Sequence, residues 1–408
     1  AHKSPRVLEQ ELNIVKNDAF RFRGWRRHMP FLNLYTNAGY YKMSDRDFQE
    51  IDSSLNLTYN LSARYPIYAF GAIEAEREAA FLREKLAQHS AVIEWRRLVN
   101  EIRQSFYRAV ILKGDIATQE KQVALEKRRQ SRSAANRDIG RLSEAEHLAR
   151  EVDIRQRELT LNTVKIELAN ILAQLRITTG FDTLTLADIP ADIASPAVDC
   201  ALLERRLEAF RPRAAANDTE ETRRDITYRA LLDEEITQAE ARALPNISLG
   251  ASISQSPYQI NDRFEMRTQL FGGISATWNL FDRDITNTTV RSLRTEQRLV
   301  DARMRTGKVN RLNNMTAQIA QIRAAQELLA LRTQNLDAAS KNLEGVSKNL
   351  DLGRTDSLAL EEAETYVATV RQGILHDRVT IARAYFQFQS DIEHDPAVTL
   401  YTVPSNED

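Results

Sequence analysis

The amino-acid sequence predicts a mainly α-helical protein that also contains four β-strands and is built from two similar copies. Three observations carry this prediction. Segments resemble each other at one fixed offset, four short stretches alternate apolar with polar residues, and apolar residues recur every seven positions over much longer runs. The offset indicates an internal two-fold repeat, the alternation predicts half-buried strands, and the heptads predict helices that pack side by side.

The internal repeat depends on two separate anchors. The stretch "SARYPIYAFG" begins at Ser62, and "SATWNLFDRD" begins at Ser275, 213 residues later (275 − 62 = 213). The same offset aligns "IGRLSEAE" with "LGRTDSLA" and places Gly140 on Gly353 (353 − 140 = 213). Because two distant anchors share one offset, duplication explains the pattern better than chance does.

Each copy opens with two predicted strands that follow a proline, Pro30 or Pro245. Between Leu55 and Tyr65, Leu, Tyr and Ala alternate with Asn, Thr, Ser and Arg, which indicates one apolar and one polar face. We expect strands at about 31–43, 54–65, 246–256 and 267–280.

Heptad spacing follows each strand pair, for example from Trp95 to Val123 and from Ile322 to Leu350. It predicts two long helical hairpins, at about 72–178 with a tip near residue 140 and at about 284–391 with a tip near residue 353. The first helix, at about 72–138, would be about 100 Å long at a rise of 1.5 Å per residue.

The repeat gives a predicted division of the chain. Residues 1–180 form the first repeat, 181–244 a linker with two shorter helices, 245–393 the second repeat, and 394–408 a mostly irregular tail. The shorter helices are expected at about 201–210 and 218–243.

Composition excludes several classes of function. The 56 basic and 57 acidic residues balance, whereas a nucleic-acid binder would show a basic surplus. Cys200 is the one cysteine, so no intrachain disulfide is expected, and the six histidines lack metal-ligand spacing. No catalytic arrangement stands out.

The sequence contains no run of about 18 apolar residues, so no transmembrane helix is predicted. The first residues do not resemble a signal peptide, which in an exported protein would already be removed.

The strands suit the wall of an outer-membrane barrel, with an apolar outer face and a polar inner face. Four strands cannot enclose a useful pore, but three chains would supply twelve. The alternative, a small soluble sheet that covers a helical body, stays open at this point.

The order and spacing of these motifs resemble the TolC family of outer-membrane factors over nearly the whole chain. The resemblance rests on the proline-led strand pairs, on "YPIYAFG" and "WNLFDRD", on "RDIGRLSEAE" and "LDLGRTDSLALEEAE", and on "LANILAQLRITTG". It implies a homotrimer with one twelve-stranded barrel in outer-membrane lipid and a coiled-coil tunnel in the periplasm. Residues 181–243 and the tail would form an equatorial belt.

The resemblance also implies a function. Such a trimer is the passive exit duct of a tripartite efflux pump or a type I secretion system. It works without a cofactor or an enzymatic step, together with a periplasmic adaptor and an inner-membrane transporter of the RND, ABC or MFS type. The alternative function is a soluble periplasmic coiled-coil scaffold or adaptor protein.

Three groups of site residues follow from the resemblance. Entrance acids, which as rings would favour cations, are expected among Glu144, Glu146, Asp356, Glu361 and Glu362, although a further pore aspartate of the family falls on Ala359 here. Turn and adaptor-docking residues are expected at Gly140, Arg141, Leu142, Leu352, Gly353 and Arg354. Aromatic side chains at the membrane interface are expected at Tyr40, Tyr65, Tyr68, Trp278 and Phe281.

Ordinary charges on exposed helix faces remain the alternative for the acids. The basic stretch "EKRRQSRSAANR", residues 126–137, is interpreted as a solvated helix face. For "RFRGWRRH", residues 21–28, a position at the inner membrane surface and an exposed helix end both stay open.

Overall fold

A computed structural model describes residues 4–26, 29–44, 50–138, 144–260 and 263–399. The chain divides into two compact units. One contains residues 13–89 and 223–304 and is called the sheet unit here. The other contains residues 1–12, 90–222 and 305–408 and is called the hairpin unit.

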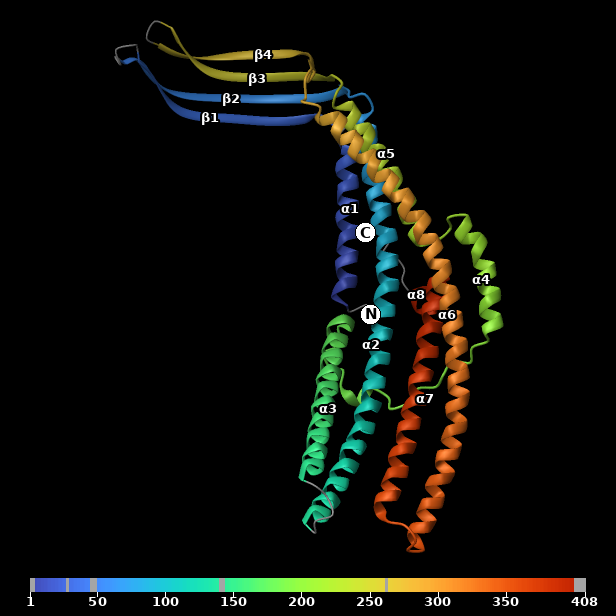
Figure 1. Cartoon of the computed structure of the whole chain (residues 1–408). Helices are drawn as coiled ribbons and strands as arrows, with labels where there is room; N and C mark the ends of the chain where they lie inside the picture. Colours follow the sequence, from blue (N-terminus) through green and yellow to red (C-terminus); the bar gives the residue numbers. More distant parts are fainter. Residues whose placement is uncertain (1–3, 27–28, 45–49, 139–143, 261–262, 400–408) are drawn as a thin grey trace. The chain divides into compact units, whose positions relative to one another are not determined.

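The sheet unit contains one four-stranded antiparallel sheet in the order β1–β2–β3–β4 (Figure 1). Its strands are β1 (Phe31–Ser44), β2 (Glu50–Tyr68), β3 (Asn246–Ile260) and β4 (Arg263–Thr277). Strands β2 and β3 pair directly although helices separate them in the sequence, with Leu61 opposite Ile253. This pairing joins the two copies into a single sheet.

The turn from strand to helix has the same backbone form in both copies. Phe70 and Gly71 have positive φ angles of 49° and 81°, and Arg283 and Asp284 have φ angles of 58° and 64°. These two pairs lie 213 positions apart (283 − 70 = 213) and directly precede α2 (Ala72–Asp138) and α6 (Ile285–Asp351). Glycine adopts this left-handed conformation at little cost, whereas the second copy places an arginine and an aspartate there.

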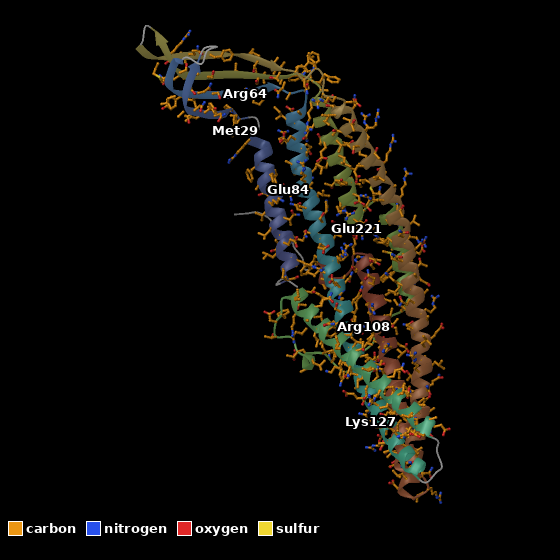
Figure 2. All side chains as sticks on the ribbon, turned by 60° about the vertical axis from the view of Figure 1, so that its left-hand side comes forward. Met29, Arg64, Glu84, Arg108, Lys127 and Glu221 are labelled. Carbon is orange, nitrogen blue, oxygen red and sulfur yellow. The ribbon has the colours of Figure 1, made fainter. Side chains whose placement is uncertain are left out.

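Helices extend the sheet unit beyond the strands. Arg21 of α1 (Pro5–Trp25) bonds to Glu84 of α2 at 2.9 Å. Arg83 of α2 bonds to Glu235 of α5 (Glu220–Ala241) at 2.7 Å. Figure 2 shows Glu84 on the α2 ribbon. A small apolar cluster that includes Ile236 packs α5 onto the first turns of α6.

The hairpin unit contains two helical hairpins, which Figure 1 shows as paired ribbons. Helix α2 pairs with α3 (Glu144–Thr179), and α6 pairs with α7 (Ser357–Asp391). Helices α2 and α6 both have 67 residues and begin 213 positions apart (285 − 72 = 213). The hairpins contact each other through α2 and α7, where the Gln372 side chain donates to Asp115 at 2.8 Å.

Two apolar clusters hold the hairpin unit together. One lies between α4 (Cys200–Ala215), α6 and α7 and includes the fully buried Phe388. The other lies between α2, α3 and α7 and includes Leu112. Burial of about 2 kcal/mol per large apolar side chain makes these clusters the main source of stability.

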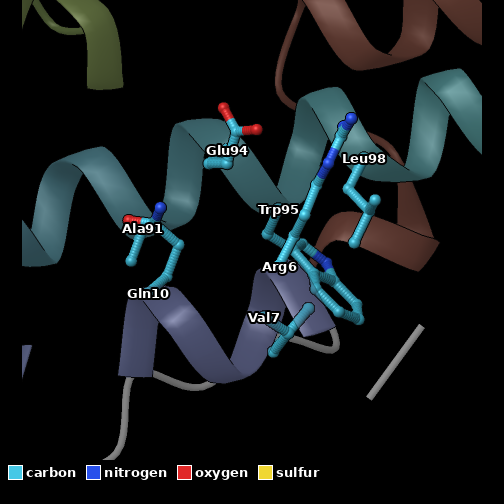
Figure 3. A pocket seen from close by; sticks show the side chains of 7 residues that line it. All are labelled: Arg6, Val7, Gln10, Ala91, Glu94, Trp95 and Leu98. Carbon is cyan, nitrogen blue, oxygen red and sulfur yellow. The ribbon is translucent and has the colours of Figure 1, made fainter. Parts of the chain in front are cut away.

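The first turns of α1 and the short helix α8 (Pro396–Thr399) pack onto α2 around Trp95. The Trp95 indole donates to the carbonyl of Ala397 at 3.2 Å. Figure 3 shows the crevice that Val7 and Trp95 help to line. Its volume of 10 Å³ leaves room for about one water molecule.

The structure adds to two expectations and corrects a third. The periodicity argument did not identify α1, although Val7 and Ile14 are buried at heptad spacing. The tail, predicted to be mostly irregular, contains the short helix α8, and Asp395 before it accepts from the backbone of Ala397. Strand β4 ends at Thr277 and not at about residue 280, because Trp278 to Phe281 leave the sheet.

The structure also bears on two wider expectations. The predicted fold class, mainly helical with four strands, is confirmed. No helix within the described part of the chain is long and apolar enough to cross a membrane. The repeat-based division of the chain stays a prediction.

Candidate channel wall and entrance

The register of the sheet assembles one continuous apolar face. One row of directly opposed residues runs across all four strands and consists of Leu34, Leu61, Ile253 and Leu270. A neighbouring row consists of Tyr65, Leu249 and Ile274. The sequence predicts this alternation strand by strand, and the register extends it across strands that come from both copies.

The opposite face is mainly polar. A row across the four strands consists of Tyr35, Asn60, Ser254 and Gln269. Ser248 and Ser275 bond through their hydroxyl groups at 2.8 Å on this face. The face is not uniformly polar, because Phe271 lies on it opposite Ser252.

The apolar face lacks a covering layer in the single chain. Leu270 is 78% exposed and Ile274 is 70% exposed. Exposed apolar surface of this extent marks contact with a membrane or with another protein. In the described sheet, β1 and β4 each pair along one edge only. Unpaired edges favour addition of a further strand.

Four of the expected interface aromatics lie at the end of the sheet where β2 and β4 both end. Tyr65 and Tyr68 lie near the end of β2 and are 42% and 54% exposed. Trp278 and Phe281 follow β4 and are 56% and 80% exposed. The Trp278 indole donates to the carbonyl of Ala243 at 2.9 Å. The backbone of Tyr40 lies in β1, but its side chain is outside the described residues.

The second hairpin has a well-defined tip. The amide of Arg354 donates to the carbonyl of Asn349 at 2.8 Å, and that of Gly353 donates to Leu350 at 2.9 Å. Gly353 has a φ of +67°, so this is the glycine-centred motif that commonly ends a helix. The exposed Leu352 precedes it.

Asp356 then caps the start of α7, because its carboxylate accepts from the amide of Ala359 at 2.9 Å. The equivalent turn of the first hairpin, Gly140, Arg141 and Leu142, lies outside the described residues. Glu144 and Glu146 begin α3 and are exposed.

The three acids of the second hairpin all meet arginines of α2. Arg129 bonds to Glu362 at 2.7 Å. The neighbouring pairs are Arg128 with Glu361 and Arg132 with Asp356. The basic stretch of residues 126–137 therefore does more than form a solvated helix face, because three of its arginines bind the other hairpin.

The pKa shifts of two of these side chains agree with the contacts. The hydrogen bond to Glu362 raises the pKa of Arg129 above its usual value. The backbone of Ala359, followed by the Arg132 side chain, lowers the pKa of Asp356. Both shifts favour the charged forms, so the ion pairs persist at neutral pH.

No group of three or more potential metal ligands occurs among the residues that the structure describes. The geometry offers two candidate sites, which are a two-faced sheet that can form a wall and a patch of three ion pairs near the tip of the second hairpin.

Comparisons with known proteins agree with this geometry. Residues 226–391 match the family model of outer membrane efflux proteins. No curated protein sequence gives a significant match to the chain.

Several solved structures share the fold. The Campylobacter jejuni CmeC outer membrane channel has a TM-score of 0.68 at 11% identity, covering 96% of this chain and 83% of its own. The Vibrio cholerae outer membrane protein VceC has a TM-score of 0.63 at 15% identity, covering 97% and 93%. The open state of the Neisseria gonorrhoeae MtrE outer membrane channel has a TM-score of 0.63 at 14% identity, covering 95% and 86%.

The chain therefore shares its fold with these solved outer-membrane channels. The family match covers the part of the chain that contains β3, β4, α6 and α7.

Proposed function

We propose that the chain forms a homotrimeric exit duct for efflux or secretion, which an inner-membrane transporter energises and a periplasmic adaptor connects. The observation that carries the proposal is the two-faced sheet. Its apolar row from Leu34 to Leu270 suits lipid, and its polar row from Tyr35 to Gln269 suits a water-filled lumen.

The free strand edges support the oligomeric state. A β1 edge can accept the β4 edge of a second copy, and three copies close a barrel of twelve strands without an open edge. Closure satisfies the edge N–H and C=O groups, which would be costly to leave unpaired in lipid.

The tip contacts support a gate. Arg128, Arg129 and Arg132 hold α7 against α2 through acids near the hairpin tip. Breaking these pairs would free the second hairpin to move and would expose its carboxylates. We therefore place the entrance of the duct at the tips, with Leu352, Gly353 and Arg354 as adaptor contacts.

Extraction from membranes tests the duct. The chain should resist a high-salt wash, require detergent for release from outer membranes, and then migrate with the mass of a trimer. A soluble monomer in the salt wash would instead support the coiled-coil scaffold.

Reconstitution provides the second measurement. Detergent-purified trimers should give ion conductance in planar bilayers, whereas heat-dissociated chains should not. Absence of conductance from intact trimers, even after loss of the tip arginines, would count against a duct.

A further inference from the structure

A pocket lies on the polar face of the sheet, at the end where the strands meet the helices. It has a volume of 540 Å³. Its polar lining consists of Arg26, Arg64, Asn246, Ser248 and Thr277. Arg64 lies on the same face as its opposed partner Phe31 (Figure 2 labels Arg64).

The register explains why these side chains converge. Asn246 opposes Thr277, and Pro66 opposes Ser248, so their side chains share the polar face with Arg64. Arg26 reaches the pocket from the segment that follows α1. Two positive charges and several neutral hydrogen-bonding groups therefore face one cavity.

The two arginines differ from most arginines of the chain. Neither Arg26 nor Arg64 forms an ion pair or a side-chain hydrogen bond with any described residue. Arg128, Arg129 and Arg132 near the hairpin tip, by contrast, each have a carboxylate partner. A guanidinium without a carboxylate presents its donors to an incoming oxyanion, which it can bind in a bidentate manner.

The pocket also has an apolar part. Met29, Pro30, Phe31 and Pro66 line it. Phe31 is 67% exposed, so its ring is accessible to a bound molecule. The combination suits a molecule that has one anionic group and an apolar body.

We propose that this pocket binds amphipathic organic anions, which carry a carboxylate, sulfonate or phosphate group, as they pass through the duct. The inference rests on the proposed function, since a closed barrel turns the polar face inward. Three copies would then bring six guanidinium groups to the base of the lumen, where they raise the local concentration of anions.

Binding to the assembled trimer in lipid nanodiscs tests the proposal. The probe is naphthalene-1-sulfonate, followed by isothermal titration calorimetry with empty nanodiscs subtracted. A naphthalene that carries a trimethylammonium group in place of the sulfonate reports binding by the apolar part alone. We expect the sulfonate to bind more tightly than the ammonium compound, and its affinity to fall with added salt.

Substitutions identify the site. Arg26→Gln and Arg64→Gln should each weaken sulfonate binding about tenfold, as expected for the loss of one charged hydrogen-bonding group. Arg64→Lys should retain part of the affinity. Arg83→Gln, which removes an arginine paired with Glu235 elsewhere in the sheet unit, is the matched control and should change nothing.

Two results would overturn the inference. One is equal affinity for the sulfonate and the ammonium compound, and the other is unchanged affinity in the Arg26→Gln and Arg64→Gln trimers. Because Arg26 lies outside the strands, its variant tests the site even where a strand substitution impairs folding. If the wild-type chain forms no detergent-extracted trimer, the proposed function fails instead, and the two failures are thereby distinguished.

Discussion

The Nη2 atom of Arg129 lies 2.7 Å from Oε1 of Glu362, so an ion pair joins α2 of the first hairpin to α7 of the second. The Nε atom of Arg129 donates to the same oxygen at 3.1 Å, and its Nη1 atom bonds to Glu126 at 2.7 Å. An exposed pair contributes about 0.2–1 kcal/mol. Three such pairs in one patch sum to about 0.6–3 kcal/mol, which can shift an equilibrium between open and closed tips of the proposed duct by about threefold to a hundredfold.

The first prediction concerns this patch. Simultaneous replacement of Arg128, Arg129 and Arg132 by Gln should raise the mean single-channel conductance, because α7 loses its partners on α2. Single-channel recording in planar bilayers measures the effect. Lys341→Gln is the control, since Lys341 pairs with Asp337 within one helix.

Single substitutions separate two roles of Glu362. If it lines the pore, Glu362→Gln should lower cation preference and Arg129→Gln should raise it. If it only closes the tip, both variants should raise conductance without opposite shifts in reversal potential. Unchanged currents in every variant would show that the patch takes no part in gating.

The double change Glu146→Ala and Glu362→Ala should alter conductance or cation preference if both acids reach the entrance.

The sequence predicts the strands and hairpins because their signals are local. A period of two residues marks β2, and a period of seven marks α6, whatever lies elsewhere in the chain. Likewise, Gly353 signals a turn from its own conformational freedom. The Arg129 contact carries no such signal, because 233 residues separate it from Glu362.

The second prediction concerns the two faces of the sheet. Leu270→Arg should reduce the yield of membrane-inserted trimer, because an arginine on the lipid face costs about 2–4 kcal/mol at the bilayer midplane. Gln269→Arg places the same side chain one residue away, on the opposite, polar face of the sheet, and should be tolerated. The measurement is the amount of trimer in washed outer membranes on unheated gels. Equal yields from both variants would argue against lipid contact by the Leu270 face.

The third prediction concerns the fully buried Asp395, which two donors of Arg103 bind. Asp395→Leu should destabilise the hairpin unit by about 3–5 kcal/mol, because it leaves Arg103 without its carboxylate. Thermal unfolding measures the loss. Asp192→Leu removes an exposed partner of Arg378 and should cost far less.

A second substitution tests the cause of that loss. Adding Arg103→Met to Asp395→Leu should restore much of the stability, because an apolar pair leaves no charge unpaired. If the double variant is less stable than Asp395→Leu alone, packing at residue 395 and not the unpaired charge is responsible.

The ion pairs at the start of α5 could not be predicted from the sequence. Arg96 of α2 bonds to Glu221 at 2.8 Å and to Glu393 at 3.3 Å, and these partners come from distant segments. The sequence predicts a shorter helix at about 218–243, but its charged partners depend on tertiary packing. Burial raises the pKa of Glu221, yet the attraction of Arg96 and Arg311 outweighs it and leaves the pKa lowered.

The last prediction uses Asp391, at the end of α7, which accepts from Gln318 at 2.8 Å and from Gln387 at 2.9 Å. Burial, together with the nearby Glu221, raises its pKa above the usual 3.8, although both glutamines and Arg311 oppose the shift. In the window between 3.8 and the raised pKa, the folded chain binds more protons than the unfolded chain. Its stability contribution is therefore complete below this window and is lost as pH rises through it.

Asp391→Asn should consequently raise the melting temperature at pH 7. In a chain of this size, each kcal/mol added to the free energy of unfolding raises it by at most about 2–4 °C. The gain should shrink as the pH falls towards 4, where the wild-type carboxyl is itself protonated. Asp337→Asn is the control, because its exposed carboxylate pairs with Lys341 and carries no burial penalty. A melting temperature that falls equally at both pH values would show that the carboxylate is needed for its hydrogen bonds, and that its burial as a charge costs little.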